Sequence, residues 1–283
     1  MSHPQGLPDH LAALSRTLVM GVVNVTPDSF SDGGKFDTET SAVKHGLALA
    51  NDGADIVDVG GESTRPGAQR VTLEEELNRV IPVVTELVAN SVVVSVDTMR
   101  AEVAKQAIAA GAYIINDVSG GQADPEMFKI IAEERTPYIM MHWRGHSAHM
   151  IEQANYVDVV NEVKAELAMQ LAKAIEAGIS TDRIVLDPGL GFAKMPEQNW
   201  PLLKHISKFS ELGCPLLVGA SRKRFLGELL ATQGQLRDVA DRESATTALT
   251  TLLASQGVWA VRVHDVIAAR DAIAVVEKLK EQQ

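Results

Sequence analysis

The chain has 283 residues, of which 46% are hydrophobic and 22% are charged, and its formal net charge is −11. Surfaces that bind nucleic acid or membranes need an excess of Lys and Arg, so this acidic balance argues against both kinds of partner. The single cysteine, Cys214, cannot form a disulfide within the chain, which is typical of a protein in a reducing cytoplasm. The N-terminus lacks a cationic start followed by an apolar core, so we expect no secretory signal.

The domain organisation is simple. No linker rich in Ser, Gly or Pro divides the chain, and no internal repeat is visible. Residues 1–16 have neither strand nor helix periodicity, so we expect them to form a flexible N-terminal arm. Residues 17–283 then form one domain, slightly larger than the usual eightfold barrel.

Eight apolar runs along the chain are rich in Val and Ile, which suit strands buried on both faces. Each run ends in polar or charged residues, which in chain order are Asn24, Asp58, Asp97, Asn116, His142, Asp187, the trio Ser221, Arg222 and Lys223, and the pair Arg262 and His264. A barrel of parallel strands with its active site at the carboxyl ends of the strands produces this pattern. The sequence therefore predicts an α/β protein with a single TIM (β/α)8 barrel.

Helical patterns lie between the runs. Apolar residues recur every three or four positions over residues 77–88, which predicts an amphipathic helix. Thr72 and Glu75 form a plausible capping box at its start, and Pro82 predicts a kink. Four glycines stand where a helix should end shortly before a strand, namely Gly53, Gly111, Gly178 and Gly213.

The strongest local signals are two loops, TPDSFSDGG at 26–34 and GGESTRPGA at 60–68. Each loop follows a strand directly and mixes glycines with hydroxyls and charges. Glycines let the backbone approach a ligand closely, while Ser, Thr and Arg donate hydrogen bonds to phosphate-like oxygens. The same residues form turns well, so plain turn-rich connections are the alternative.

Polar side chains at four strand ends could converge inside the mouth of the barrel. They are the carboxylates of Asp58, Asp97 and Asp187 and the amide of Asn116. An ionised carboxylate accepts two adjacent N–H donors, as the edge of an aminopyrimidinone ring presents them. The alternative is that one or two of these residues cap the following helix, and capping is a serious rival for Asp97.

The segment LDPGLGFAK at 186–194 has two glycines spaced as in a dinucleotide fingerprint, but Lys stands where the third small residue belongs. A Rossmann interpretation is therefore weak. We expect the glycines to turn the loop sharply after Asp187 and to present Phe192 as an apolar wall for a flat ring. Core packing of Phe192 is the alternative.

Cations gather at several strand ends of this acidic chain, at Arg65, Arg222, Lys223, Arg262 and His264. This favours a bound small anion, with ordinary surface cations as the alternative. Arg262 and His264 are two residues apart on one strand, so their side chains point the same way. GASRKRFLG at 219–227 places Lys223 where a strand gives way to a helix, a position that attracts anions. We expect Lys223 to donate hydrogen bonds, because a role as base would require burial that lowers its pKa.

Taken together with SVDT, INDVSGG, SRKRFLG and RVHD, these loops occur in the order and spacing of dihydropteroate synthases, the folate-pathway enzymes targeted by sulfonamides. The chain resembles that family from about Val19 to its C-terminal helix. The resemblance implies a barrel that joins a dihydropterin methyl diphosphate to 4-aminobenzoate and releases diphosphate, with Mg²⁺ present. It also implies a homodimer formed through helices near the C-terminal half.

The resemblance further implies site residues, position by position. Those that hold the pterin ring are Asp97, Asn116, Asp187 and Lys223, and those that line its pocket are Asp58, Met141 and Phe192. Those on the diphosphate side are Asn24, Thr64, Arg65, Arg262 and His264, and Asn24 is also the metal position. Those around aminobenzoate are Thr26, Pro27, Phe30, Ser221 and Arg222. We expect Asp97, Lys223, Arg262 and His264 to act in catalysis.

Three features depart from the family pattern. Leu190 stands where many members have Phe, Ala193 where many have Gly, and MHWRG replaces a more usual MHM-type run after the fifth strand. These changes concern the wall of the ring pocket rather than the reaction. Two alternatives remain open: a corrinoid-linked methyltransferase, which needs no diphosphate clamp, and a non-catalytic pterin-binding paralogue, which would lose loop residues.

The implied reaction explains the residue types. Diphosphate leaves readily once its charge is neutralised, and Mg²⁺, Arg65, Arg262 and His264 can supply that neutralisation. The arylamine nucleophile is already neutral at pH 7, so no strong general base is required. We therefore expect a dissociative substitution.

Overall fold

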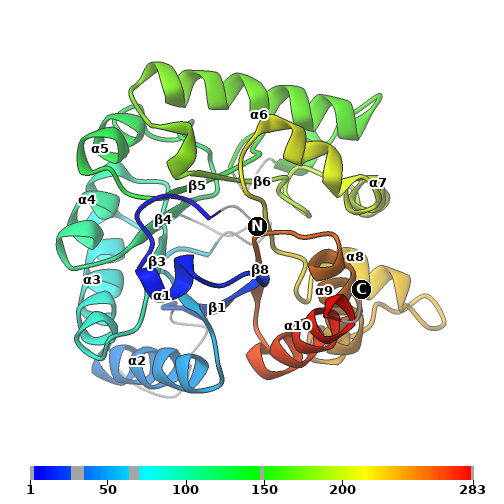
Figure 1. Ribbon diagram of the computed structural model, residues 1–283, viewed down its shortest axis with the longest axis horizontal. Coiled ribbons are helices and arrows are strands. Elements are labelled where there is room, and N and C mark those ends of the chain that lie inside the picture. Colours follow the sequence, from blue (N-terminus) through cyan, green and yellow to red (C-terminus); the bar gives the residue numbers. More distant parts are fainter. Residues whose placement is uncertain (1–2, 27–34, 64–69, 147–149, 282–283) are drawn as a thin grey trace.

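The computed structural model describes residues 3–26, 35–63, 70–146 and 150–281, and Figure 1 shows helices surrounding a central sheet. The strands are β1 (Leu18–Asn24), β2 (Ile56–Gly60), β3 (Val94–Asp97), β4 (Ile114–Asp117), β5 (Tyr138–Met141), β6 (Ile184–Asp187), β7 (Leu217–Val218) and β8 (Ala260–Val263). All of the strand pairings are parallel. The predicted TIM barrel is confirmed.

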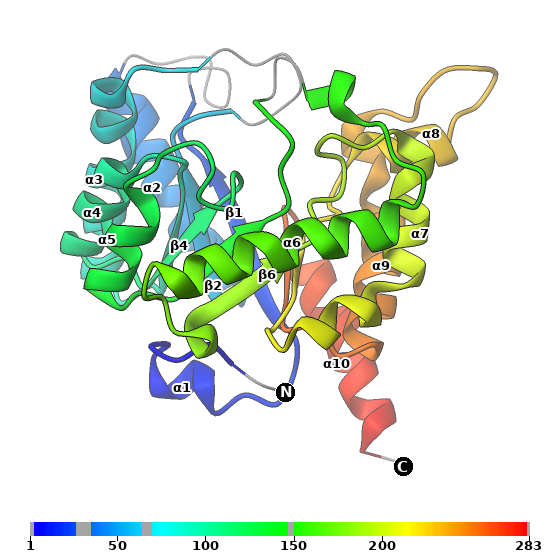
Figure 2. The ribbon, with the colours of Figure 1, turned by 90° about the horizontal axis from the view of Figure 1, so that it is seen from above.

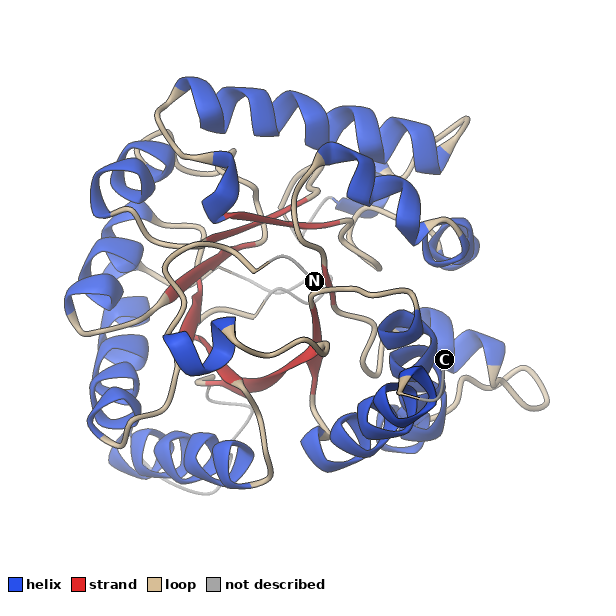
Figure 3. Ribbon diagram, in the orientation of Figure 1, coloured by secondary structure: helices blue, strands red, loops and turns tan. Residues whose placement is uncertain are grey.

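The strands follow the spatial order β6-β5-β4-β3-β2-β1-β8-β7. The two ends of this order meet, because Leu186 on β6 forms a parallel bridge with Leu216, just before β7. There the Leu186 amide donates a hydrogen bond to the Pro215 carbonyl at 2.9 Å. The sheet is thus a nearly closed barrel (Figure 3).

Helices follow the strands in alternation, as the sequence predicts. The α-helices are α1 (Asp9–Ala12), α2 (Lys35–Asn51), α3 (Leu73–Ala89), α4 (Ala101–Ala109), α5 (Met127–Glu134), α6 (Val159–Glu176), α7 (Asn199–Lys204), α8 (Arg224–Leu229), α9 (Glu243–Ser255) and α10 (Val266–Lys280). The 3₁₀ turns are η2 (Met150–Gln153), η3 (Thr181–Arg183), η4 (Pro196–Gln198), η5 (Ile206–Leu212) and η6 (Val239–Arg242). No helix within the described ranges is long and apolar enough to span a membrane.

The start of α3 confirms half of the predicted capping box. The Thr72 hydroxyl accepts a hydrogen bond from the Glu75 amide at 3.2 Å, but the Glu75 side chain pairs with Arg79 instead of turning back to Thr72. The helix is assigned without a break through Pro82. The four glycines predicted to end helices all have positive φ, between +80° and +101°.

Two layers of apolar side chains flank the strands, because successive strand residues point to opposite faces. Val19 and Val57 pack outward against the helices, in the same cluster as Val80 and Leu87 of α3. The residues that alternate with them point into the barrel, where Leu18, Met20, Ile56, Ile114, Ile139, Val185 and Leu217 form a second cluster. These inward residues fill the end of the barrel where the strands begin.

The N-terminal arm, expected from the sequence to be flexible, packs against the filled end of the barrel (Figure 2). Leu7 and Leu11 are buried in the same cluster as Trp259. The Trp259 indole N–H donates to Nδ1 of His3 at 3.1 Å, and the Gln5 amide donates to the Asp182 carbonyl at 2.7 Å. The described part of the arm is therefore held by apolar burial and hydrogen bonds.

Candidate active site

The strand alternation that builds the inner core also places the polar residues. Each lies two residues beyond an inward apolar residue on the same strand and so points into the same interior, one layer closer to the carboxyl ends. The pairs are Ile56 with Asp58, Ile114 with Asn116, Val185 with Asp187, and Ala260 with Arg262, and the same alternation places the apolar Met141 two residues beyond Ile139. Asp97 joins this layer through the register of β3 with β4, in which it lies opposite Asn116.

Arg262 links the acidic residues across the mouth. Its Nε donates to Oδ2 of Asp58 at 2.6 Å, and its Nη2 donates to Oδ2 of Asp97 at 3.0 Å. The Asn116 amide donates to the same oxygen of Asp58 at 3.0 Å. The other oxygen of Asp58, Oδ1, is buried and has no hydrogen-bond partner among the described residues. A buried acceptor of this kind is suited to an N–H donor on a ligand.

Burial changes the protonation of this group. It raises the pKa of Asp97 to about 7, against the opposing attraction of Arg262, while Asp58 and Asp117 raise it further. Burial also raises the pKa of Asp187, which Lys223 and a hydrogen bond from the Gly189 amide oppose. That amide lies 2.7 Å from Oδ1 of Asp187. The mouth is therefore less negative at neutral pH than its number of carboxyl groups suggests.

Lys223 comes directly before α8, as its N-cap residue. Its Nζ donates to the Leu190 carbonyl and lies 4.7 Å from the centroid of the Phe192 ring. Burial lowers the pKa of Lys223 to about 8, against the opposing attraction of Asp187. The burial that a role as base would require is therefore present, contrary to expectation, but the ammonium form still dominates at pH 7 and donates a hydrogen bond.

An apolar wall borders the acidic group. Met99, Val118 and Met141 are buried in a small cluster of their own, and Phe192 packs against it. Met141 and Phe192 are predicted from the sequence, whereas Met99 and Val118 are not. A signal for them exists, since each lies two residues beyond a strand-end polar residue and so continues the alternation of its strand.

The loop after β6 turns as the sequence predicts. Gly189 and Gly191 have φ of +68° and +75°, values that favour glycine. A Cβ atom on Gly189 would lie only 2.6 Å from the His142 carbonyl oxygen. The Gly191 amide donates to Oδ1 of Asn199 on α7 at 2.7 Å. These constraints fix the path of the loop and bring Phe192 to the wall.

The basic side of the mouth combines the segment before α8 with the end of β8. The Ser221 hydroxyl lies 2.9 Å from Nδ1 of His264 and accepts a hydrogen bond from the His264 amide at 3.2 Å. Arg222 adopts a φ of +58°, and its Nε donates to Glu243 at the start of α9 at 2.8 Å. Arg262, implied by the resemblance to face the diphosphate, here contacts the acidic residues and so joins the two sides.

Some predicted residues lie elsewhere or outside the described ranges. Pro27, Phe30, Thr64 and Arg65 lie outside the described residues. Asn24 ends β1, is half-buried and lies opposite Gly60 in the sheet register, and Thr26 is half-buried two residues further on. Asp97 does not cap α4, whose N-cap is Arg100 without a side-chain cap bond.

An ion-pair cluster next to the mouth has no signal in the sequence. Arg100 donates to Glu62 at 3.0 Å and to the buried Glu76, and Thr98 donates to the other oxygen of Glu76. These contacts join the segment after β2, the first turns of α3 and the segment after β3. Neither Glu62 nor Arg100 ends an apolar run, so pattern reasoning misses both.

Comparison with known proteins agrees with this geometry. The model of the pterin binding enzyme family matches residues 20–264. A dihydropteroate synthase of Mycobacterium leprae is 51% identical over 266 residues, covering 93% of this chain and 94% of that protein. The structure of Xanthomonas albilineans dihydropteroate synthase with 4-aminobenzoic acid is 45% identical, with a TM-score of 0.87 over 94% of this chain and 93% of that one. The complex of the X. albilineans enzyme with 7,8-dihydropteroate is 43% identical, with a TM-score of 0.84 over 94% of both chains. The chain belongs to the dihydropteroate synthase family of pterin binding enzymes.

Proposed function

We propose that the chain condenses (7,8-dihydropterin-6-yl)methyl diphosphate with 4-aminobenzoate, giving 7,8-dihydropteroate and diphosphate. The observation that carries this proposal is the convergence of Asp58, Asp97, Asn116 and Asp187 with Lys223 and Arg262 in one end of the barrel. The relatives bound to 4-aminobenzoic acid and to 7,8-dihydropteroate support it.

The acidic residues are suited to the pterin ring. The edge of the ring presents adjacent N–H donors, which carboxylate and amide oxygens accept side by side. The unpartnered Oδ1 of Asp58 is one such acceptor. The wall of Met99, Val118, Met141 and Phe192 covers the flat face of the ring with apolar surface, and Lys223 offers a donor beside it.

Arg262 is placed to serve the ring site and the leaving group together. A guanidinium has five N–H donors in a fixed plane, and hydrogen bonds to Asp58 and Asp97 use two of them. The remaining donors can bind diphosphate oxygens while the guanidinium keeps its hydrogen bonds to Asp58 and Asp97. His264, which contacts Ser221, lies directly after the end of β8, two residues beyond Arg262, and adds to the basic side.

These residues assist a substitution at the methylene carbon. The bond from carbon to the diphosphate oxygen breaks with its electron pair on diphosphate, and the amine nitrogen supplies the pair for the new C–N bond. Arg262 and His264 stabilise the charge that develops on the leaving oxygens in a partly dehydrated site. The carboxylates stabilise the positive charge on the pterin methylene, and the amine loses its extra proton to solvent after the bond forms.

We also propose Mg²⁺ as the cofactor, with Asn24 as its protein ligand. Mg²⁺ prefers oxygen ligands and is often held by one or two protein groups together with substrate phosphates. No three His, Cys, Asp or Glu side chains gather into a metal site within the described ranges. The amide oxygen of Asn24 at the end of β1 fits a site of this shared kind. When bound, the ion neutralises diphosphate charge.

A homodimer in the cytoplasm completes the proposal. The C-terminal helices carry exposed apolar side chains, among them Leu252 on α9 and Val275 and Leu279 on α10. An apolar groove between α7 and α9 is lined by Trp200, Leu249 and Leu252. Sedimentation equilibrium tests the dimer, and a single monomeric species at micromolar concentration would contradict it.

The proposed compartment is the cytoplasm. Cys214 is buried and forms no disulfide, which agrees with a reducing compartment.

A diphosphate-release assay tests the reaction. We expect rapid release of diphosphate from the dihydropterin substrate only when 4-aminobenzoate is present, with equal formation of dihydropteroate. A non-catalytic paralogue would bind the pterin without releasing diphosphate. A methyltransferase would give no diphosphate under any of these conditions, and either result contradicts the proposal.

A further inference from the structure

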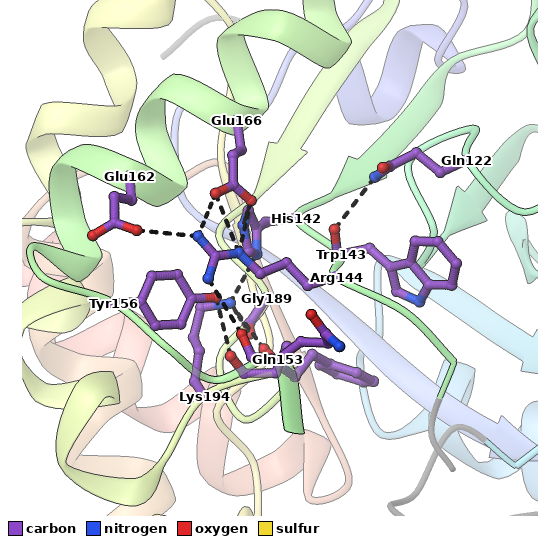
Figure 4. A network of polar contacts seen from close by, with 12 residues as sticks. Gln122, His142, Trp143, Arg144, Gln153, Tyr156, Glu162, Glu166, Gly189 and Lys194 are labelled. Carbon is purple, nitrogen blue, oxygen red and sulfur yellow. Dashed lines mark hydrogen bonds and ion pairs between the residues drawn. The ribbon is translucent and has the colours of Figure 1, made fainter. Parts of the chain in front are cut away.

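A polar network packs against the loop after β6, which carries Phe192 (Figure 4). At its centre is Lys194, whose side chain is almost fully buried. Its Nζ lies 3.0 Å from each of three acceptors, namely Nδ1 of His142, the Gly189 carbonyl and the Phe192 carbonyl. Two of these acceptors belong to the loop after β6, and the third belongs to the segment after β5.

The number of acceptors matches the charged form of lysine. An ammonium group has three N–H donors and no lone pair, so it satisfies all three contacts. A neutral amine has two N–H donors, which leaves one acceptor facing a lone pair. The ammonium is therefore the form that satisfies all three acceptors around Lys194, and losing its proton would release one contact to the loop or to His142.

His142 sets the direction of the Lys194 ammonium. Because its Nδ1 accepts from Lys194, its Nε2 carries the proton and donates to Glu166 on α6 at 2.9 Å. Burial and the charge of Lys194 lower the pKa of His142 to about 4, so the neutral ring that this arrangement needs is the stable form at neutral pH. His142, Glu166 and Lys194 thus form a chain of hydrogen bonds from α6 to the loop.

Arg144 and Tyr156 hold the loop from a second side. Arg144 donates to Glu166 at 3.0 Å and stacks over the Tyr156 ring, 3.8 Å from its centroid. The Tyr156 hydroxyl donates to the Ala193 carbonyl at 3.0 Å. Ala193 has a φ of +46°, a conformation that normally favours glycine. The network thus brings together the MHWRG run, which contains Arg144, and the loop position of Ala193.

We propose that Lys194 is a positioning residue that fixes the Phe192 wall of the pterin pocket, and that His142 and Glu166 orient it. Lys194 fixes the carbonyl of Phe192, and Tyr156 fixes the next carbonyl along the chain. The Phe192 ring contacts the other residues of the apolar wall and the Lys223 ammonium. A shift of the Phe192 backbone would therefore change both contacts. The pterin as ligand rests on the proposed function, whereas the fixing of the loop does not.

Charged or titratable groups from four parts of the chain surround Lys194: Asp187 of β6, Lys223 before α8, Arg144 and the neutral His142 after β5, and Glu166 of α6. Burial lowers the pKa of Lys194 to about 7, and Asp187 opposes this effect. The ammonium form is complete well below that pH and is lost as the pH rises through it. Pterin binding should therefore weaken over this range in a way that depends on Lys194.

The test compares Lys194→Met with Lys164→Met. The first variant keeps an unbranched side chain but removes the three donors, and the second removes a lysine of α6 that pairs with Glu211 on the surface. With K194M we expect the KM for the dihydropterin diphosphate to rise about tenfold and the KM for 4-aminobenzoate to stay within about twofold. Hydrogen exchange of residues 188–195, followed by mass spectrometry, should quicken at least about tenfold, while K164M matches the wild type in both measurements.

The pH profile separates positioning from a general loss of stability. The rise of the pterin KM between pH 6 and pH 8 should be smaller in K194M than in the wild type, because the titrating group is gone. Unchanged KM, exchange and pH profile in a folded K194M protein would overturn the proposal. If K194M does not fold, Glu166→Gln tests the same hydrogen-bond chain, with an expected rise of about threefold in pterin KM, and no change there would overturn the proposal too. A wild type without turnover would refute the proposed function, yet the exchange measurement would still decide whether Lys194 fixes the loop.

Discussion

Arg262 on β8 donates a hydrogen bond to Asp97 on β3 at 3.0 Å, although 165 residues separate the two in the chain. The same guanidinium binds Asp58 on β2. Three strands thus contribute to one charged group, although only Asp97 ends its strand, since Asp58 lies in the middle of β2 and Arg262 is the penultimate residue of β8. This group connects the acidic ring site to the basic side of the mouth, and four predictions follow from it and from its surroundings.

The first prediction concerns Arg262. Replacing it with Met removes the donors for the leaving diphosphate and leaves Asp58 and Asp97 without their cation, so kcat/KM should fall at least about 100-fold, on the scale of one lost oxyanion donor. Arg262→Lys should not restore activity, because an ammonium lacks the planar set of donors that lets one group bind Asp58, Asp97 and diphosphate together. Arg224→Met is a matched control, since Arg224 is exposed and pairs with Glu228 one turn along α8. Wild-type turnover in R262M would exclude the assigned role.

The second prediction concerns the pH dependence of stability at Asp97. Its pKa is about 7 in the folded protein, against an ordinary value of 3.8 in the unfolded chain, so the folded state binds the proton more tightly. The stabilisation is complete below pH 3.8 and is lost as the pH rises through 7. Asp97→Asn removes this titration. Between pH 5 and pH 8 the free energy of unfolding should therefore fall less in D97N than in the wild type.

Urea unfolding at pH 5 and at pH 8 measures this difference. Asp52→Asn serves as the control, because Asp52 is exposed directly after the last turn of α2. Parallel pH dependences of wild type and D97N would show that the raised pKa of Asp97 makes no contribution.

The third prediction concerns Gly189. An alanine there must adopt a φ of +68° and place its Cβ 2.6 Å from the His142 carbonyl oxygen. The left-handed conformation alone costs roughly 1–2 kcal/mol for a residue with a Cβ. Gly234 also has a positive φ, +79°, but a Cβ atom there would meet no other atom within 4 Å. Denaturant unfolding should therefore show G189A to be less stable than G234A. An equal loss of unfolding free energy in the two variants would mean that the loop after β6 accommodates the Cβ without strain.

The fourth prediction concerns Asn24 and Mg²⁺. Removing divalent cations with a chelator should lower turnover, and added Mg²⁺ should restore it. Asn24→Ala should raise the Mg²⁺ concentration needed for half-maximal turnover by about tenfold, since it removes one oxygen ligand. Turnover that is unaffected by chelation would rule out the cofactor.

The barrel and its inner layer are predictable because the side-chain period of a strand is two. Once a strand is recognised, Asn116 and Asp187 must point inward, as must the apolar residues two positions earlier. The turn after β6 follows from its glycines in the same direct way. These inferences need only local chemistry, and the structure agrees with each.

Pairing across the barrel is not predictable in this way. The sequence leaves open whether Asp97 caps a helix or binds a cation, and the contact with Arg262 depends on the strand order and tilt. Lys194 shows the same limit, because a lysine in a loop is normally exposed and its contacts depend on how the loop after β6 packs against the segment after β5. Leu11 lies in the four-residue helix α1 and Leu7 precedes it, and so short a helix has no periodic pattern to reveal that the arm packs on the barrel.

A crystal structure of the chain with (7,8-dihydropterin-6-yl)methyl diphosphate tests the central claim most directly. The account predicts the pterin edge within hydrogen-bond distance of Asp58, Asp97, Asn116 or Asp187, its face against Phe192, and the diphosphate next to Arg262. A pterin bound elsewhere, or bound with its ring away from these carboxylates and its diphosphate away from Arg262, would contradict it.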